Sequence, residues 1–177
     1  RHSSSAASDV YKRQVFVSSD ASELAGAIND VTNKSGQLDF VHMALVEMDR
    51  QDTFFIHADT DRGVSRETAS SFRHRYPYTM VYRIDQLSDV QASNAIKIAK
   101  THLGKAYNFT YYNADSTLYC SQLIHLAFES DSIFGMNPMT FKNPESDSFN
   151  AFWTSYYDSL GIDCLLYTSD AADELCR

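Results

Sequence analysis

The stretch that decides the fold is LYCSQLI, Leu118–Ile124. It lies where a polar, Tyr-rich loop changes into a helical pattern, so we expect Cys120 to begin a helix that runs to about Glu129. A thiol at a helix start faces the positive end of the helix dipole, which favours the thiolate. With a histidine in reach, such a thiolate can attack an acyl group. Cys120 is therefore the candidate nucleophile.

Two histidines upstream of this stretch, His42 and His57, lie on strand-like segments that flank a turn. If the turn is Asp49-Arg50, His42 lies directly opposite His57, and a register shifted by two residues keeps both on one face as diagonal neighbours. We assign His42 as the general base and His57 as the group that fixes its tautomer, and the order of these two roles stays open.

The same constellation predicts the remaining parts of a catalytic site. The backbone N–H groups of Cys120 and Ser121 are candidate donors to a tetrahedral oxyanion. We expect the Cys120 sulfur within about 4 Å of a His42 ring nitrogen. The aromatic side chains that flank the site are candidates for the substrate cleft: Tyr119, Tyr107 and Tyr112.

Each of these residues also has a purely structural interpretation. Cys120 could pack as a small apolar residue on the core face of its helix with Leu123 and Ile124. A histidine in a strand is commonly a hydrogen-bonded structural residue, and tyrosines commonly fill a core or its rim.

The two ends of the chain look foreign. Residues 4–14 and 164–174 resemble the two opposite-strand translations of one sequencing-library adaptor. We therefore predict that residues 1–14 and 164–177 are artefactual or disordered ends, the alternative being natural Ser/Ala-rich tails. Residues 15–163 then form one domain, which we expect to be truncated at both ends.

Composition narrows the classes of partner. The chain carries a formal net charge of −8 and no basic stripe, which argues against nucleic acid as a partner. No apolar run approaches the roughly 20 residues that a membrane-spanning helix needs. Cys120 is the one cysteine between the foreign-looking ends, and no Cys/His spacing resembles a zinc site, so we expect neither a metal nor a cofactor.

Hydrophobic periodicity predicts an α+β fold with an antiparallel sheet packed against helices. We expect strands at 15–17, 40–48, 53–58 and 78–84. Two helices begin at caps: a short one that Ser65 caps and a longer one that Ser88 caps. The longer helix places Val90, Ile96, Ala99 and Leu103 on one face. Further helices are expected at about 20–31, 120–129 and 149–160.

The sequence resembles the permuted papain-like hydrolases, in the YiiX-like branch of the NlpC superfamily. LYCSQLI is similar to that family's F-Y-C-S-E-L-V, and FVHMALV at Phe40–Val46 is similar to its F-S-H-V-G-I-V strand. FIHA at Phe55–Ala58 resembles V-I-E-A, and GKAYN at Gly104–Asn108 resembles G-K-P-Y-D. Ala44 and Asn108 depart from the family's Gly and Asp.

The resemblance implies a permuted papain-like fold with Cys120 as nucleophile and His42 as base. The third polar position, often Glu in this family, falls on His57. It also implies hydrolysis of an amide bond through a thioester, with a cell-wall peptide as leading substrate class and the cell envelope or periplasm as location. The alternatives are a lipid-directed acyltransferase or thioesterase, for which a long apolar groove would lie beside Cys120, and a non-catalytic binding domain.

Overall fold

The computed structural model describes residues 14–18, 23–32, 40–85, 87–112, 114–134, 141–143, 146 and 148–162. The chain divides into two compact units, one of residues 1–20 and 40–137 and the other of residues 21–39 and 138–177. The foreign-looking ends lie outside the described residues, except that Gln14 begins the first strand. Among the described residues, no helix combines the length and the apolar character needed to cross a membrane.

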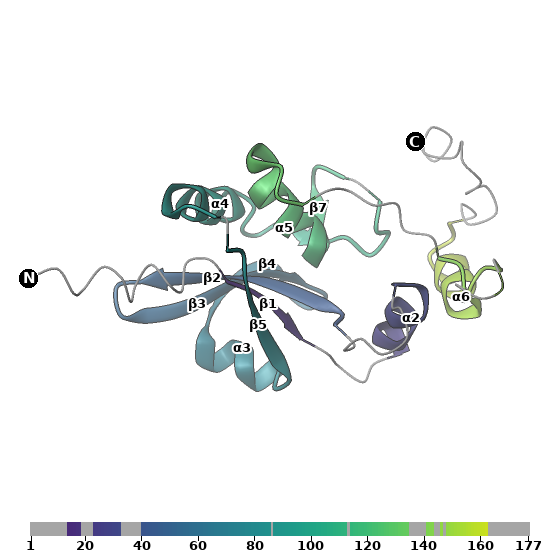
Figure 1. Ribbon diagram of the computed structural model, residues 1–177. Coiled ribbons are helices and arrows are strands. Elements are labelled where there is room, and N and C mark those ends of the chain that lie inside the picture. The colour runs from purple at the N-terminus through teal and green to yellow at the C-terminus, as the bar shows by residue number, and fades with distance from the viewer. Residues whose placement is uncertain are drawn as a thin grey trace, which may run out of the picture. The chain divides into compact units, whose positions relative to one another are not determined.

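The larger unit is built on a five-stranded antiparallel sheet in the order β4-β3-β2-β1-β5 (Figure 1). Every neighbouring pair in it is antiparallel, as the hairpin pattern predicts. The strands are β1 (Gln14–Ser18), β2 (His42–Asp49), β3 (Asp52–Asp59), β4 (Gly63–Thr68) and β5 (Thr79–Arg83).

The β2–β3 hairpin differs from the predicted register by two residues. Asp49 pairs with Asp52, so the turn is Arg50-Gln51, with Arg50 at a φ of 58°. A slip of two residues preserves the side-chain alternation of a strand, whereas a slip of one would reverse it. His42 and His57 therefore share one face of the sheet as diagonal neighbours.

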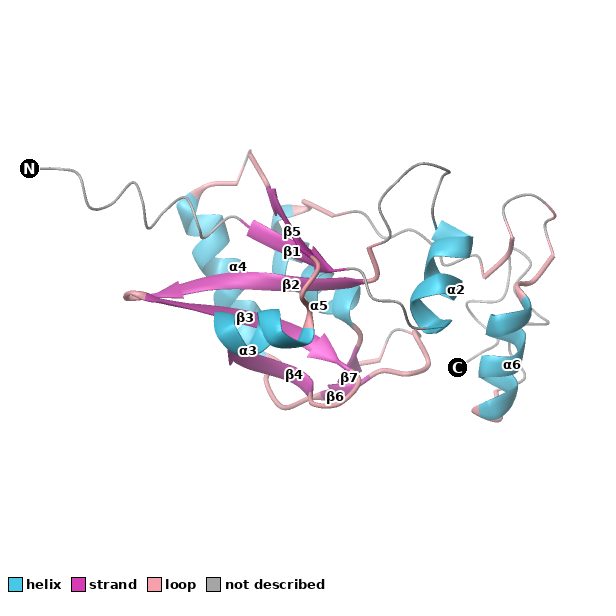
Figure 2. Cartoon of the chain, turned by 90° about the horizontal axis from the view of Figure 1, so that it is seen from below, coloured by secondary structure: helices cyan, strands magenta, loops and turns pink. Residues whose placement is uncertain are grey.

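Helices cover both faces of this sheet. In Figures 1 and 2, α3 (Ala69–Arg75) lies on one face and both α4 (Asp89–Thr101) and α5 (Cys120–Phe128) lie on the other. Even-numbered side chains of β2, such as Ala44, pack with Phe72 of α3, while Leu45 packs in the core that includes Leu123 of α5. The two histidines belong to the α3 face.

Two predictions about helices need correction. Ser65 does not cap a helix but lies in β4, and α3 begins later with Thr68 as its cap. Ser88 caps α4 as predicted, in a capping box with Gln91. The predicted core face of α4 is correct for Ala99, which is buried, and for Ile96, which packs against the core, but Val90 is 80% exposed and Leu103 41% exposed. The residues that α4 buries are alanines. Their small side chains allow α4 to lie close to the neighbouring core.

Short elements complete the larger unit. β6 (Ala106–Tyr107) and β7 (Thr117–Leu118) form a parallel pair, and β7 lies in the Tyr-rich loop predicted before Cys120. A 3-10 turn, η1 (Glu129–Asp131), extends α5. The N–H of Val64 donates to the Lys105 carbonyl at 2.8 Å, which ties the start of β4 to the chain just before β6.

The second unit contains α2 (Glu23–Thr32) and α6 (Ala151–Ser159). Asn150 caps α6 through a bond from the Phe152 N–H, and Trp153 donates its indole N–H to the Ala27 carbonyl at 3.2 Å. Gly161, at a φ of 68°, follows the end of α6, near the predicted helix end at 160. For the helix expected at about 20–31, the sequence offers Ser19 or Asp20 as a cap, and both lie outside the described residues.

Candidate active site

Cys120 begins α5, and its sulfur lies against the main chain of β2. The Sγ atom is 4.0 Å from the carbonyl oxygen of Val41, the residue before His42. The N–H groups of Met43, Ser121 and Cys120 itself favour the thiolate, but burial outweighs them and raises the thiol pKa. The prediction that the helix start holds Cys120 as a thiolate is therefore wrong for the free protein.

His42 is a buried, neutral imidazole. Its ring stacks on Tyr76, with ring centroids 4.7 Å apart and an interplanar angle of 15°. Burial, and next the neighbouring His57, lowers the pKa of His42 to about 3, with Arg75 acting in the same direction and Asp59 against it. At neutral pH the ring therefore has an unprotonated nitrogen, which a general base requires.

His57 connects His42 to a carboxylate. The Nε2 atom of His42 and the Nδ1 atom of His57 lie 2.9 Å apart, and His57 Nε2 lies 2.7 Å from Glu67 Oε1. His57 is completely buried. Burial lowers its pKa, although Asp59 and Glu67 act in the opposite direction. The two histidines that the sequence placed on one sheet face are thus brought into direct contact.

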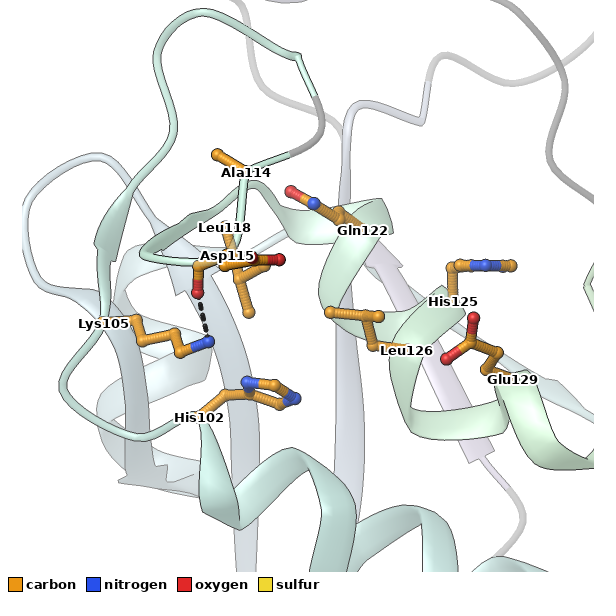
Figure 3. Close-up of a pocket in the computed structure, with 9 residues that line it drawn as sticks. All are labelled: His102, Lys105, Ala114, Asp115, Leu118, Gln122, His125, Leu126 and Glu129. Atoms are coloured by element: carbon orange, nitrogen blue, oxygen red, sulfur yellow. Dashed lines mark hydrogen bonds between the residues drawn. The ribbon is translucent and has the colours of Figure 1, made fainter.

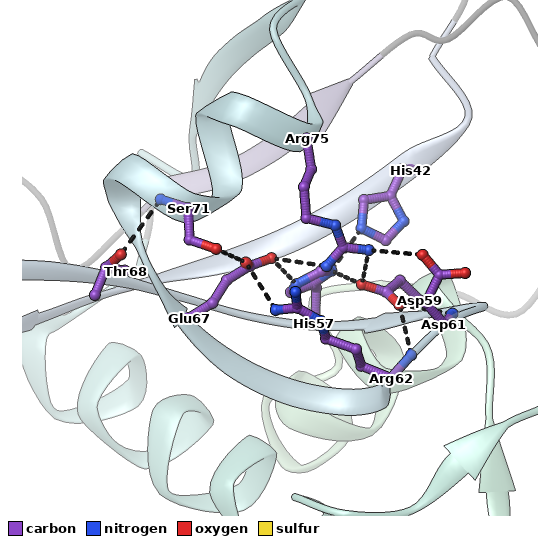
Figure 4. Close-up of polar contacts among 9 residues, drawn as sticks. All are labelled: His42, His57, Asp59, Asp61, Arg62, Glu67, Thr68, Ser71 and Arg75. Carbon is purple, nitrogen blue, oxygen red and sulfur yellow. Dashed lines mark hydrogen bonds and ion pairs between the residues drawn. The ribbon is translucent and has the colours of Figure 1, made fainter.

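A cluster of charged side chains surrounds this pair on the α3 face (Figure 4). Arg75, at the end of α3, lies 2.6 Å from Asp59 Oδ2 and 3.3 Å from Glu67 Oε1. Burial alone would raise the pKa of Asp59, but bonds from the Arg62 N–H and the Arg75 guanidinium hold it below the usual value. Ser71 donates its hydroxyl to Glu67 Oε2 at 2.5 Å.

The Cys120 sulfur lies close to the point of β2 from which His42 extends. His42 points to the α3 face, whereas α5 packs on the opposite face and its sulfur reaches the main chain on either side of His42. Among the hydrogen bonds of the described residues, none joins Cys120 Sγ to a His42 ring nitrogen. Contacts of this kind are often long in unliganded enzymes and shorten when substrate binds.

Two of the predicted cleft tyrosines, Tyr107 and Tyr119, form an aromatic chain with Tyr111. The Tyr111 ring lies 6.4 Å from the Tyr107 ring and 5.5 Å from the Tyr119 ring, measured between centroids. Tyr112 is half-buried, and its carbonyl accepts a bond from the Asn108 side chain. A role for these rings in substrate binding stays a prediction, as do the oxyanion roles of the Cys120 and Ser121 N–H groups.

An open pocket of about 470 Å³ lies on the outer side of α5 (Figure 3). Leu118 and Gln122, two residues before and after Cys120, contribute to it, but Cys120 does not. Most of the other side chains that line it are polar or charged: His102, Lys105, Asp115, His125 and Glu129.

Within the described part of the chain, one His/carboxylate group has ligand atoms close enough together to hold a metal ion. It consists of His57, Asp59 and Glu67, whose ligand atoms lie within 4.8 Å of one another. Arg75 already contacts both carboxylates, and His57 bonds to Glu67 and His42. These contacts fit an ion-paired hydrogen-bond cluster, because a metal would have to displace the guanidinium.

Sequence reasoning missed Glu67, Asp59 and Arg75. Glu67 was assigned to a helix, so it could not be expected on the face that carries His57. Residues 63–68, GVSRET, show no alternation of apolar and polar side chains, so the pattern did not mark β4 as a strand.

The fold and site together define a class. An antiparallel sheet that carries histidine, with a cysteine at the start of a helix packed on it, is typical of the papain-like cysteine hydrolases. Here the histidine precedes the cysteine, which is the permuted order.

The particular family follows from the comparison with family models. The chain belongs to the permuted papain-like amidase enzymes of the YaeF/YiiX, C92 family, whose model matches residues 14–162. The predicted family and the predicted α+β, permuted papain-like fold are thereby confirmed.

A solved structure has a similar fold. The chain resembles the metalloprotein yiiX from Escherichia coli O157:H7 with a TM-score of 0.59 and 20% sequence identity, over 69% of this chain and 66% of that chain. The chain thus spans slightly less than two thirds of that protein. No curated protein matches the chain.

Proposed function

We propose that the protein cleaves an amide bond in a peptide by nucleophilic catalysis at Cys120, with a cell-wall peptide as the leading substrate class. The observation that carries the proposal is the position of the Cys120 sulfur, 4.0 Å from the Val41 carbonyl and so beside the backbone of His42. Membership of an amidase family supports the reaction class.

In the proposed reaction, His42 accepts the Cys120 thiol proton as the sulfur attacks the amide carbonyl carbon. The backbone N–H groups of Cys120 and Ser121 stabilise the oxyanion. The C–N bond then breaks, and the amine leaves with the proton from His42 while a thioester forms. Water hydrolyses the thioester and regenerates the thiol. His57 keeps the His42 ring in its productive orientation.

A polar lining beside the start of α5 favours a peptide over an acyl chain. His102, Lys105 and Asp115 contribute charged or hydrogen-bonding groups to the pocket there. Such groups suit the amides, amines and carboxylates of a peptide. A lipid-directed reaction, the alternative, would need a long apolar groove beside Cys120.

The decisive experiment compares Cys120→Ala with Cys164→Ala in the full chain. Cys120→Ala should abolish release of new amino groups from a cell-wall peptide panel, because no other group supplies the nucleophile, and should leave the fold intact. Cys164→Ala should retain activity. Mass spectrometry of the quenched reaction should find the acyl group on the Cys120 peptide.

Turnover by Cys120→Ala would overturn the proposed mechanism. Acyl release from a lipid panel, without cleavage of peptides, would instead support the lipid-directed alternative.

A further inference from the structure

The hydrogen bonds from Glu67 through His57 to His42 have a direction. A carboxylate only accepts hydrogen bonds, so His57 must donate from Nε2 across the 2.7 Å contact with Glu67. A neutral imidazole has one N–H, which leaves Nδ1 of His57 as an acceptor. His42 must then donate from Nε2 across the 2.9 Å contact with His57. The lone pair that remains on His42 is on Nδ1.

Glu67 is held firmly enough to impose this direction. Its side chain is 5% exposed, and α3 supplies donors to both oxygens, from Arg75 to Oε1 at 3.3 Å and from Ser71 to Oε2 at 2.5 Å. Arg62 adds a third, longer ion-pair contact at 3.5 Å. These donors hold the side chain in place and fix the oxygen that faces His57.

The neighbouring carboxylate of Asp59 does not play the same part. Its Oδ2 atom lies 3.7 Å from His57 Nδ1, beyond hydrogen-bond distance, and 2.6 Å from Arg75. Its Oδ1 atom accepts bonds from the N–H groups of Asp61 and Arg62. Asp59 is thus occupied by Arg75 and by its own turn.

We infer that Glu67 is a positioning residue that sets the tautomers of both histidines and makes Nδ1 of His42 the atom that accepts the Cys120 proton. The effect of Glu67 on catalysis rests on the proposed function, whereas its effect on the tautomers does not. Glu67 touches neither substrate nor sulfur and acts through His57. His57 occupies the position that is often Glu in the resembling family. Here the carboxylate comes instead from Glu67 of β4, which contacts His57 rather than His42.

The test is the substitution Glu67→Gln, with the tautomers of His42 and His57 and the kcat as the two measurements. A glutamine keeps the shape of the side chain, but its amide can either donate to His57 or accept from it, so the direction is no longer imposed. Ring ¹⁵N NMR of the wild type should find both His57 and His42 protonated at Nε2. The variant should lose that preference, and its kcat should fall about 10- to 100-fold with little change in KM, because a misplaced proton removes the base.

The matched control is Glu47→Gln. Glu47 is also a buried strand carboxylate, paired with Arg66 at 2.6 Å and with Lys100 on α4, away from the histidines. Its substitution should leave the tautomers and kcat unchanged. A purely structural role for Glu67 would make the two variants behave alike.

A wild-type spectrum with a proton on Nδ1 of either histidine would overturn the inference, even if Glu67→Gln failed to fold. Unchanged tautomers with an unchanged kcat in a folded variant would do the same. Failure of the proposed function looks different: Cys120→Ala would keep its turnover, while the NMR measurement would still report the direction of the protons.

Discussion

At the scale of the residue, two opposing influences act on the Cys120 thiol. The start of a helix favours a negative charge by about 0.3–1 kcal/mol, whereas taking a charge out of water costs several kcal/mol. Burial therefore prevails and raises the thiol pKa, despite the N–H groups of Met43, Ser121 and Cys120. Because His42 is neutral as well, the free protein holds a thiol and an imidazole rather than an ion pair.

This balance predicts how the thiol reacts with an alkylating agent. The rate of Cys120 modification by iodoacetamide should be low at pH 5–7 and should still be rising above pH 9, because a raised pKa moves thiolate formation to higher pH. The modified Cys120 peptide can be quantified by mass spectrometry. The same peptide in urea-unfolded protein provides the reference, and a fast, pH-independent rate at pH 5–6 would contradict the prediction.

At the scale of the element, β4 is the strand that supplies the carboxylate in contact with His57. It carries Glu67 to the face of His57 and Arg66 to the opposite face, where Arg66 pairs with Glu47. Its polar composition could not reveal this, because the alternation of a strand is visible only when one face is apolar. The charged partners that allow β4 to be buried come from distant segments of the chain.

Gly63 at the start of β4 supplies a second prediction. It has a φ of 65°, and a Cβ atom there would lie 2.2 Å from the Lys105 carbonyl oxygen. Gly63→Ala should therefore lower the free energy of unfolding by about 3 kcal/mol or more, from the clash added to the backbone strain. Denaturant unfolding measures the loss.

Gly104→Ala is the control for that strain. Gly104 has a φ of 87° but nothing within 4 Å of its Cβ position, so its substitution should cost only about 1–2 kcal/mol. Equal losses in the two variants would show that the contact with Lys105 is unimportant.

At the scale of the whole molecule, the buried histidines make stability depend on pH. The folded-state pKa of His42, about 3, lies below the 6.5 of an ordinary histidine, so the unfolded chain takes up the proton first as pH falls. The stability contributed is complete above about pH 6.5 and is lost on the way down to pH 3. His57 and Asp59, whose pKa values are also lowered, act in the same direction.

As the pH falls from 6.5 to 4, protonation of His42 in the unfolded chain should lower the free energy of unfolding by roughly 3 kcal/mol, at about 1.4 kcal/mol per pH unit. Urea titrations at several pH values measure this slope. His42→Gln, which cannot take up the proton, should flatten it. A wild-type stability that is the same at pH 7 and pH 4 would contradict the burial of a neutral imidazole.

The sequence by itself determined the features that depend on local periodicity. His42 and His57 share a face of the β2–β3 hairpin both in the predicted register and in the observed one, which differs by two residues. Ser88 caps α4, and Cys120 begins α5. Only the tertiary structure decided which face the histidines occupy, which carboxylate orients them and whether the thiol is ionised. The face depends on which strands are neighbours, the carboxylate on the contacts that Arg75 of α3 makes with it, and the thiol on its burial away from water. Each of these is set by contacts between residues far apart in the chain.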